Sequence, residues 1–332
     1  MNNPQTAERT VNGGAAPVSG PPVLRKKKKD ITRTIFIIAL MIVPIIHFLV
    51  FTIYINLDTV VLSFQRKNSQ GIYVFNDDLL KNYKDFFRVS FTSYSTFPTA
   101  IKNSIMYFVL NDVVIVPCSV VITYFLYKRV FMHQVFRVVF YLPCIVSMVV
   151  MIMSYRFMFD SSFGVINPLL ELLGLEDLIP YEFGWLGTRK TANGVIIGYC
   201  IWAGLGGNFI LLASAMERIP EELVEAGKID GLGFFGELWS ITIPLIGTTL
   251  ATLYMMGTSV IFTFFLQVKL LTNGGPNGAT GTIMLYIVES IKSNTNDLSG
   301  SATVGMLIAL VGTPLVLLTR WIVDRVFPSY EY

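Results

Sequence analysis

The sequence predicts an all-α integral membrane protein with six membrane-spanning helices. Its composition argues against an ordinary soluble protein, because 53% of the 332 residues are hydrophobic and only 14% are charged, against about 25% charged residues in a typical soluble domain. The mean hydropathy is +0.60. The apolar residues come in long blocks, each close to or above the ~20 residues that a helix needs to cross the hydrocarbon core. A lone strand would leave its backbone groups unpaired in lipid, so each block is expected to be a helix.

The N-terminal end of the chain is predicted to be a disordered, basic tail over residues 1–30. Residues 1–24 contain almost no large apolar side chains, and the basic run from Arg25 to Lys29 follows them. The apolar stretch Ile35–Leu57 comes next and is longer than the core of a secretory signal, about 7–15 residues, so it is expected to span the membrane and stay in the chain. Residues 31–100 are therefore assigned to a first membrane helix and an external loop.

Five further spans are predicted within residues 101–326, which are expected to form the core, with a short tail at 327–332. The spans are Asn103–Tyr127, Val138–Phe159, Gly194–Met216, Ile241–Gln267 and Ser301–Val323. Four prolines lie within the spans or at their ends, where neighbouring helices can satisfy the freed carbonyl groups, and we expect them to mark kinks. They are Pro117, Pro143, Pro244 and Pro314.

The distribution of basic residues predicts a cytoplasmic N-terminus. The cluster at 25–29 precedes the first span, and an even number of spans returns the C-terminus to the cytoplasm beside Arg320 and Arg325. The connection between the second and third spans is also basic, at Lys128 and its neighbours. The segment 65–100 counts against this orientation, because it carries five basic residues and yet must lie outside. Since that segment is long and also contains aspartates, it constrains the topology only weakly.

The connection between the fourth and fifth spans, residues 217–244, is predicted to be a cytoplasmic helix-turn-helix. Pro220 suits the first turn of a helix, two glutamates follow it where the helix dipole favours anions, and two glycines after Asp230 permit a sharp exit. We therefore expect a short amphipathic helix from Pro220 to about Ile229 and a second helix from Phe234. An ordered pair of helices in such a connection is typical of a docking surface.

The residues of this loop resemble the EAA loop of binding-protein-dependent ABC import permeases, written E-A-A, three residues, G, nine residues, I-x-L-P. The matching residues are Glu225-Ala226-Gly227, Gly231 and Ile241-Thr242-Ile243-Pro244. The spacing fits without a gap, and the departures are Gly227 for alanine and Ile243 for leucine. The resemblance implies the type I ABC importer permease fold and a coupling helix that docks on an ATP-binding subunit. The residues assigned to docking are Glu222, Glu225, Ala226, Gly227, Asp230 and Gly231.

An alternative for the same helix is that it lies on the bilayer surface. Such a helix favours Lys and Arg on its polar face, whereas this one is acidic. In the docked arrangement, the small residues Ala226 and Gly227 would permit a close approach, and Glu225 and Asp230 would form charge-assisted contacts.

A second resemblance concerns the segment after the fifth span. Leu271-Thr272-Asn273-Gly274-Gly275-Pro276 is similar to an element of carbohydrate permeases of the maltose and glycerol-phosphate type, and the likeness extends over about Val135 to Val323. It implies a sugar cargo, with Gly274, Gly275 and Pro276 on the side of an extracytoplasmic binding protein. The alternative is that these three residues only make an external turn.

The positions that contact sugar in the maltose-type permease carry no strongly polar side chain here. They correspond to Cys200, Ala203, Gly204, Gly207, Val260, Ile261 and Phe264. We therefore expect small residues to line a wide path, with a few polar or aromatic contacts beside them. The residues assigned to the path are Trp202, Gly204, Gly207, Asn208, Tyr254 and Thr258. The alternative is that the small residues only allow close helix packing.

Two of the charged residues within the predicted spans, Asp112 and Arg156, are candidates for a role. Asp112 is in the second span, where a carboxylate is costly; it serves either in an interhelical hydrogen bond shared with Asn111 or in gating. Arg156 lies near the outer end of the third span, where its guanidinium is expected to reach the interface. The resemblance implies that this edge borders the mouth of the path.

No enzyme active site, cofactor or metal site is expected on this chain. The sequence contains no phosphate-binding loop of the form G-x-x-x-x-G-K-[ST], and its two histidines are too few for a metal cluster. The resemblance implies that ATP and Mg²⁺ belong to partner subunits. The expected partners, in the cytoplasmic (inner) membrane of a bacterium, are a second homologous permease subunit, two ATP-binding subunits, a sugar-binding protein and membrane lipid. The small net charge of +3 argues against nucleic acid.

Two other functions stay open at this stage. One is the same machine carrying glycerol phosphate, which would favour basic side chains along the path. The other is an ion-coupled secondary transporter, which typically shows internal repeats and buried ionisable residues at the middle of the membrane.

Overall fold

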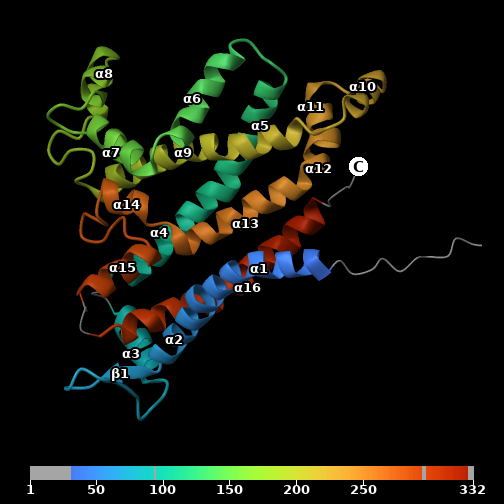
Figure 1. Ribbon diagram of the computed structural model, residues 1–332. Coiled ribbons are helices and arrows are strands. Elements are labelled where there is room, and N and C mark those ends of the chain that lie inside the picture. The colour runs from blue at the N-terminus through green and yellow to red at the C-terminus, as the bar shows by residue number, and fades with distance from the viewer. Residues whose placement is uncertain (1–30, 93–94, 294–296, 328–332) are drawn as a thin grey trace, which may run out of the picture. The chain divides into compact units, whose positions relative to one another are not determined.

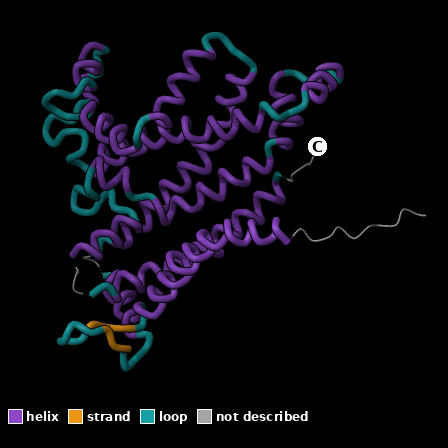
Figure 2. Tube along the Cα trace, viewed as in Figure 1, coloured by secondary structure: helices purple, strands orange, loops and turns teal. Residues whose placement is uncertain are grey.

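The computed structural model describes residues 31–92, 95–293 and 297–327. The predicted tails at 1–30 and 328–332 lie outside the described residues. The chain divides into two compact units, the first ending at Ile55 and the second beginning at Asn56. Helices make up most of the described chain, and the strands are confined to one short hairpin (Figures 1 and 2).

The first unit is a single apolar helical run. It consists of α1 (Ile31–His47) and a π-helical turn at Phe48–Tyr54, and α2 (Ile55–Leu62) continues the run into the second unit. The segment Ile35–Leu62 is long and apolar enough to cross a membrane, as predicted. Up to Leu57 its large apolar side chains are exposed, from 40% at Ile53 to 72% at Val43. Such a surface is stable only against lipid or another protein.

The second unit begins with a small folded element in the predicted external loop. Strands β1 (Gln65–Lys67) and β2 (Tyr73–Phe75) pair antiparallel, with Arg66 opposite Val74, and α3 (Lys81–Ser90) follows. Three ion pairs join the basic residues of this element to its aspartates. They are Arg66–Asp77 at 3.1 Å, Lys84–Asp78 at 2.6 Å and Arg88–Asp85 at 3.1 Å. The positive charge of this segment is thus largely compensated.

Three predicted spans are uninterrupted helical runs. The second runs from Phe97 to Tyr127 through α4 (Phe97–Val109), a π-helical turn at Leu110–Ile115 and α5 (Val116–Tyr127). The fourth is α9 (Arg189–Met216) and the sixth is α16 (Ser299–Val326). Pro117 lies in the first turn of α5, and α16 continues through Pro314.

The third and fifth spans are bent, as the kinks expected at Pro143 and Pro244 predict. The third consists of α6 (His133–Ile145) and α7 (Met148–Met158), which meet at 110°. The fifth consists of α11 (Phe234–Glu237), a π-helical turn (Leu238–Thr242), α12 (Ile243–Leu245) and α13 (Gly247–Thr263), with a bend of 75° between its two parts. Each bend follows a proline, Pro143 or Pro244, by two or three residues. Proline lacks the N–H that an uninterrupted helix requires.

The remaining elements lie at the ends of these spans. They are α8 (Ile166–Leu172), a 3₁₀ turn (Glu176–Leu178), α10 (Glu221–Ile229), α14 (Leu266–Leu271) and α15 (Ile283–Ser293). Within the second unit, α13 packs along α16, and α9 packs along α5 and α6. Figure 1 shows α8 and α10 at opposite ends of α9, a helix of 28 residues and therefore about 42 Å long. The segments before and after α9 thus emerge on opposite sides of the helical layer.

Candidate coupling surface and solute cavity

The connection between α9 and α13 forms the two short helices that the sequence predicts. α10 begins at Glu221, directly after Pro220, and ends at Ile229. α11 begins at Phe234 and continues through the π-helical turn into α12.

The inner face of α10 is held against the membrane helices by apolar packing. Val224 is 9% exposed and belongs to a cluster that includes Met216 and Leu238. Gly227 is also buried, and a Cβ atom at this position would lie 2.5 Å from Ile241 Cδ1. The glycine that replaces the second alanine of the EAA pattern therefore lets α10 approach the start of the fifth span. Gly227 faces inward and is not on the exposed surface.

A left-handed residue turns the chain between the two helices. Gly231 has φ +81°, a conformation that costs about 1–2 kcal/mol for other residues. The Leu232 amide then donates to the Gly227 carbonyl at 2.9 Å, which satisfies one of the last carbonyl groups of α10.

The second short helix is tied to the end of α5. Lys128 forms an ion pair with Glu237, whose side chain is only 7% exposed. Tyr124 donates its hydroxyl to the Phe234 carbonyl at 3.0 Å, and the two rings lie 4.7 Å apart. This anchor was not predicted from the sequence. Its signal is a lysine at the end of one span and a glutamate in the connection 217–244, both on the side predicted to be cytoplasmic.

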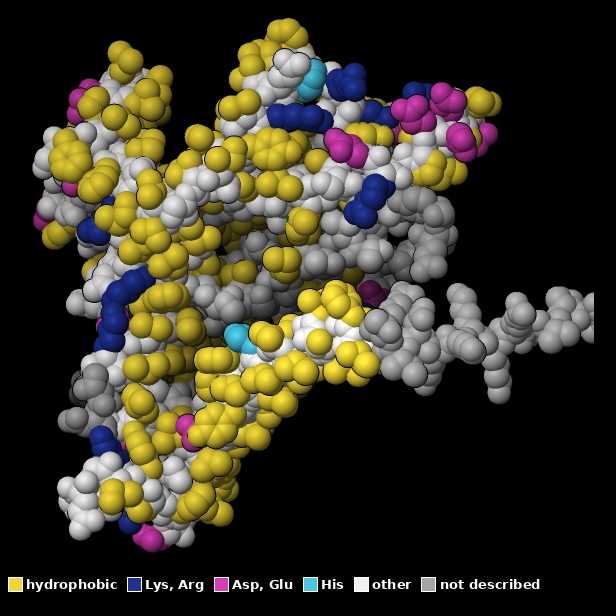
Figure 3. Space-filling model, in the orientation of Figure 1, with side chains coloured by type: hydrophobic (Ala, Val, Ile, Leu, Met, Phe, Trp, Pro, Cys, Tyr) yellow, Lys and Arg dark blue, Asp and Glu magenta, His cyan; other side chains and the backbone are white. Residues whose placement is uncertain are grey.

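The outer face of the helix pair is exposed, acidic and apolar. Glu222, Glu225, Ala226, Asp230 and Gly231 are all exposed. Figure 3 shows acidic side chains gathered over the end of the molecule that carries α10. Three large apolar side chains of the helix pair are also exposed: Leu223 at 41%, Ile229 at 86% and Phe235 at 61%. A surface of this composition is suited to a protein partner with an apolar groove and basic groups.

A cavity of about 190 Å³, the solute cavity, lies where the second, third, fourth and fifth spans meet. Its lining includes five of the seven positions that correspond to sugar contacts in the maltose-type permease. The lining residues are Tyr107, Asn111, Ile115, Met148, Tyr199, Cys200, Ala203, Gly204, Val260, Phe264 and Gln267. None of these side chains is charged.

The polar groups of the cavity come from residues that the sequence analysis did not assign to the path. Asn111, Gln267, Tyr107 and Tyr199 are the lining residues with amide or hydroxyl side chains. Tyr107 donates its hydroxyl to Asn193 Oδ1 at 3.4 Å, and the Gln267 amide lies 3.9 Å from Met148 Sδ. The fifth span breaks at Phe264 and Phe265, which lie between α13 and α14. This break was not predicted from the sequence, and it places Val260 and Gln267 in different helices.

Of the residues assigned to the path, only Gly204 lines this cavity. Asn208 donates to Ser119 Oγ at 3.3 Å, and Thr258 is fully buried and donates to Thr319 Oγ1 at 3.0 Å. The remaining three lie elsewhere: Trp202 stacks on Tyr155 with centroids 6.3 Å apart, Tyr254 stacks on Phe327 at 6.4 Å, and Gly207 faces open space.

The small residues of α9 serve partly in close packing. A Cβ atom at Gly206 would lie 2.3 Å from the Phe140 carbonyl oxygen, and one at Gly204 would lie 2.9 Å from Ile115 Cγ2. Both glycines therefore let α9 approach its neighbours, and Gly204 also opens the cavity.

Asp112 lies in the π-helical turn of the second span and is 8% exposed. Asn111 Nδ2 donates to its Oδ1 at 3.0 Å, so this bond joins neighbours in one helix and does not cross between helices. The pair packs against α13 at Gly257, where a Cβ atom would lie 1.8 Å from Asp112 Oδ1. Asp112 does not line the cavity, although its neighbour Asn111 does.

Arg156 and the Gly-Gly-Pro element lie at the other end of the spans from α10. Arg156 Nη1 donates to the Leu270 carbonyl at 3.1 Å. The loop that contains Gly274, Gly275 and Pro276 is held to α4, because Asn103 Nδ2 donates to the Ala279 carbonyl at 2.9 Å. A cavity of about 280 Å³ borders Gly274 and Gly275.

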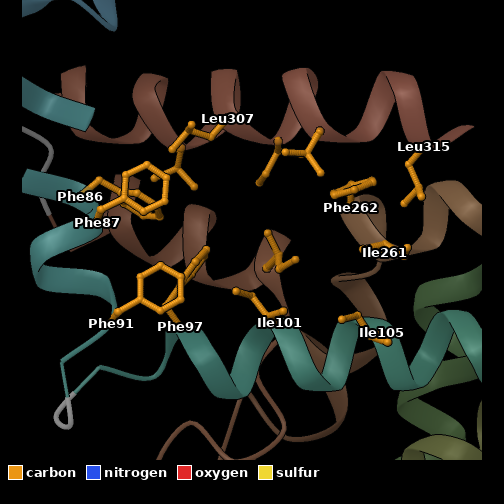
Figure 4. Close-up of a pocket in the computed structure, with 14 residues that line it drawn as sticks. Phe86, Phe87, Phe91, Phe97, Ile101, Ile105, Ile261, Phe262, Leu307 and Leu315 are labelled. Atoms are coloured by element: carbon orange, nitrogen blue, oxygen red, sulfur yellow. The ribbon is translucent and has the colours of Figure 1, made fainter. Parts of the chain in front are cut away.

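Another cavity has an entirely apolar lining, which does not suit a sugar. It has a volume of about 320 Å³ and lies between α3, α4, α13, α15 and α16, with Phe86, Phe97 and Phe262 among its walls (Figure 4). Hydrocarbon is the chemistry that fits it.

More than half of the chain matches a known protein family. The family profile described as "Binding-protein-dependent transport system inner membrane component" matches residues 115–330, more than half of the chain. The chain belongs to this family.

Individual relatives agree with the family assignment. The permease is 29% identical over 277 residues to the probable ABC transporter permease protein YurN of Bacillus subtilis, covering 82% of this chain and 91% of YurN. It is 28% identical over 273 residues to the arabinooligosaccharides transport system permease protein AraP of Halalkalibacterium halodurans, covering 80% and 81% of the two chains.

A solved structure shares the fold. It is a crystal structure of a bacterial alginate ABC transporter in complex with an alginate pentasaccharide-bound periplasmic protein. The likeness has a TM-score of 0.74 at 23% identity and covers 92% of this chain and all of the other. The permease is thus a multi-pass membrane protein with the fold of ABC importer permeases.

Proposed function

We propose that this permease forms the translocation path of an ATP-driven importer for a neutral sugar. The observation that carries the proposal is the exposed acidic and apolar face of α10 and α11. These two short helices connect the membrane helices α9 and α13, and the Lys128–Glu237 ion pair anchors them to the end of α5. A rigid element in this position can transmit a movement of an ATP-binding subunit to α9, α13 and α5 together.

The solute cavity supports a neutral sugar as the cargo. Hydroxyl and amide groups of Tyr107, Asn111, Tyr199 and Gln267 suit sugar hydroxyls, and the apolar remainder suits the faces of a pyranose ring. Glycerol phosphate would favour a lysine or arginine, and the cavity lining contains neither. AraP, by its name a permease for arabinooligosaccharides, supports the same class of cargo.

The proposed assembly places α10 in the cytoplasm and the N-terminus on the same side. A second homologous permease subunit would complete the path, and two ATP-binding subunits would hold ATP and Mg²⁺, so that no hydrolysis occurs on this chain. An extracytoplasmic sugar-binding protein would deliver the cargo near Gly274 to Pro276. The whole complex would lie in the cytoplasmic membrane of a bacterium. Closure of the ATP-binding subunits would open the path outward, and hydrolysis would return it inward, each state being favoured by its own contacts.

Uptake into proteoliposomes tests this function. The complex would be assembled from this permease and the subunits that copurify with it, and its uptake of maltose, lactose, N,N′-diacetylchitobiose and arabinotriose measured. We expect uptake of at least one neutral saccharide that requires ATP and survives an uncoupler of the proton gradient. Uptake that the uncoupler abolishes while ATP is irrelevant would instead indicate an ion-coupled carrier.

A further inference from the structure

A pair of polar cavities lies in the connection between α7 and α9, at the end of the molecule opposite α10. One has a volume of about 250 Å³ and the other about 350 Å³. They share two lining residues, Ser161 and Trp185. Nothing in the function proposed so far uses either cavity.

Trp185 is held in place on two sides. Its Nε1 donates to Asn167 Oδ1 at 2.7 Å, and its ring meets the Phe159 ring edge-on, with centroids 5.5 Å apart. An indole whose N–H is already satisfied and whose ring is fixed offers a rigid apolar platform at low entropic cost. The C–H face of a sugar ring is a ligand that fits such a platform.

The groups around the platform suit hydroxyls. The smaller cavity is lined by Ser161, Ser162, Asn167, Glu171 and Tyr181 among others. Tyr181 donates its hydroxyl to Glu171 Oε1 at 3.3 Å, so the carboxylate keeps free acceptor sites. The larger cavity adds the Arg156 guanidinium and the Asp160 carboxylate. Alternating donors and acceptors beside an aromatic ring are typical of a saccharide site.

A series of ring contacts leads from this platform to the solute cavity. Phe159 contacts Trp185 at 5.5 Å and Tyr155 at 5.0 Å, and Tyr155 contacts Tyr199 at 5.3 Å. Tyr199 lines the solute cavity, which is the inner of the cavities compared here. A row of adjacent aromatic side chains thus runs from the outer cavities to the solute cavity.

The charge of the segment selects among saccharides. The charged side chains that line the two cavities are Arg156, Asp160 and Glu171, and the connection between α7 and α9 adds Glu176, Asp177 and Glu182. Arg189 and Lys190, at the start of α9, line neither cavity. Five carboxylates and one guanidinium give a net negative charge, which disfavours uronic acids and other anionic sugars.

We propose that the cavities around Trp185 form an outer subsite that binds a neutral saccharide on the permease itself, before it enters the inner cavity. This inference rests on the proposed function. The subsite would receive a sugar ring on the Trp185 platform and pass it along Phe159 and Tyr155.

Direct binding to the full-length permease tests the subsite. The chain in lipid nanodiscs, without a binding protein, would be titrated with maltose, lactose, N,N′-diacetylchitobiose and arabinotriose, and with an alginate trisaccharide as the anionic probe. Saturation-transfer NMR would follow binding. We expect at least one neutral saccharide to bind, the alginate probe to bind more weakly, and Trp185→Ala to weaken binding about tenfold. Trp185→Phe retains a platform and is expected to lose less, and Trp321→Phe, in α16, is the matched control.

The outcomes separate this inference from the proposed function. Suppose that the assembled transporter takes up a neutral saccharide. If that saccharide binds Trp185→Ala as tightly as it binds the natural permease, or binds neither protein, the subsite is overturned and the function stands. If the anionic probe binds best, the assignment to neutral saccharides is overturned. If no neutral saccharide is taken up, the function fails and the subsite with it. Elution as a monodisperse complex shows that each variant is folded.

Discussion

Lys128 and Glu237 form an ion pair that joins the end of α5 to the second short helix of the coupling loop. The Lys128 side chain is 21% exposed and that of Glu237 is 7% exposed. The ammonium group also lies 5.6 Å from the ring centroids of both Tyr124 and Tyr127. A movement of the coupling loop therefore reaches the second span as directly as it reaches the fourth and fifth.

Breaking this pair on one side is expected to destabilise the loop. Lys128→Met leaves the Glu237 carboxylate buried without its partner, a change that costs about 3–5 kcal/mol in buried pairs. We expect a lower unfolding temperature and a loss of ATP-driven uptake in the assembled transporter. The double variant Lys128→Met with Glu237→Leu removes both charges, and its unfolding temperature is expected to recover. Equal loss in the single and double variants would show that the charge pair is not the anchor.

Gly231 is expected to be sensitive to substitution because of its backbone conformation. At φ +81° an alanine is strained by about 1–2 kcal/mol, so Gly231→Ala should weaken the turn and lower ATP-driven uptake. Gly233→Ala is the matched control, because Gly233 has φ −77° and open space around a Cβ atom. Thermal unfolding and uptake of the two variants would be compared side by side. Similar behaviour of both would contradict a conformational role for Gly231.

Glu289 gives a pH-dependent contribution to stability. The hydrogen bond from Lys269 lowers the pKa of the Glu289 carboxyl from its usual value. A carboxyl whose pKa is depressed on folding contributes stability that is present above its unfolded pKa, about 4.3, and is lost as the pH falls through the folded value. The side chain is 48% exposed, so solvent screening limits the effect of Glu289→Gln at pH 7 to within about 1 kcal/mol.

Thermal unfolding at pH 7 and in acid checks this effect. We expect the unfolding temperature of the natural permease to be slightly higher than that of Glu289→Gln at pH 7. The difference between the two unfolding temperatures should shrink below about pH 4. A difference that grows in acid would reverse the sign and contradict the pairing.

The spans and the coupling helices could be predicted from the sequence because both follow from local patterns. Apolar length alone located the first, second, fourth and sixth spans. α10 was predicted from Pro220 and the acidic first turn, and it begins and ends within one residue of the expected bounds. Propensity and capping act within one turn, so a single sequence is sufficient for these features.

The cavity could not be predicted in the same way because it depends on where helices bend. The breaks at Val146 and Phe264 bring Met148 and Gln267 to the same cavity as Asn111, and no local pattern fixes the angle of a break. Thr258 is polar and at the right depth, yet the packing of α13 on α16 turns it toward Thr319. A polar side chain in a membrane span therefore indicates a hydrogen bond to a neighbouring helix more strongly than it indicates a place on the translocation path.

Gly257 is expected to tolerate no side chain. The Cβ atom of Gly257→Ala would lie 1.8 Å from Asp112 Oδ1 and 2.4 Å from Asn111 Nδ2, so α13 or the second span must shift. We expect a lower unfolding temperature and poor uptake. Gly305→Ala, at an open position of α16, is the control and should be neutral or stabilising, since alanine is favoured over glycine in helices by about 1 kcal/mol. Normal uptake by Gly257→Ala would mean that the Asn111–Asp112 pair is free to move aside.

Gln267 is expected to set the affinity of the inner cavity for its cargo. Gln267→Leu keeps the approximate volume of the side chain but removes the amide, so a sugar hydroxyl bound there would lose its partner, a change that costs about 1–3 kcal/mol. We expect the sugar concentration for half-maximal ATP-driven uptake to rise roughly tenfold or more. Thr263→Val is the matched control, because Thr263 is exposed and its hydroxyl bonds to the Ser259 carbonyl of its own helix. If Gln267→Leu and Thr263→Val take up sugar with the same concentration dependence, the cavity between Asn111 and Gln267 is not where the cargo binds.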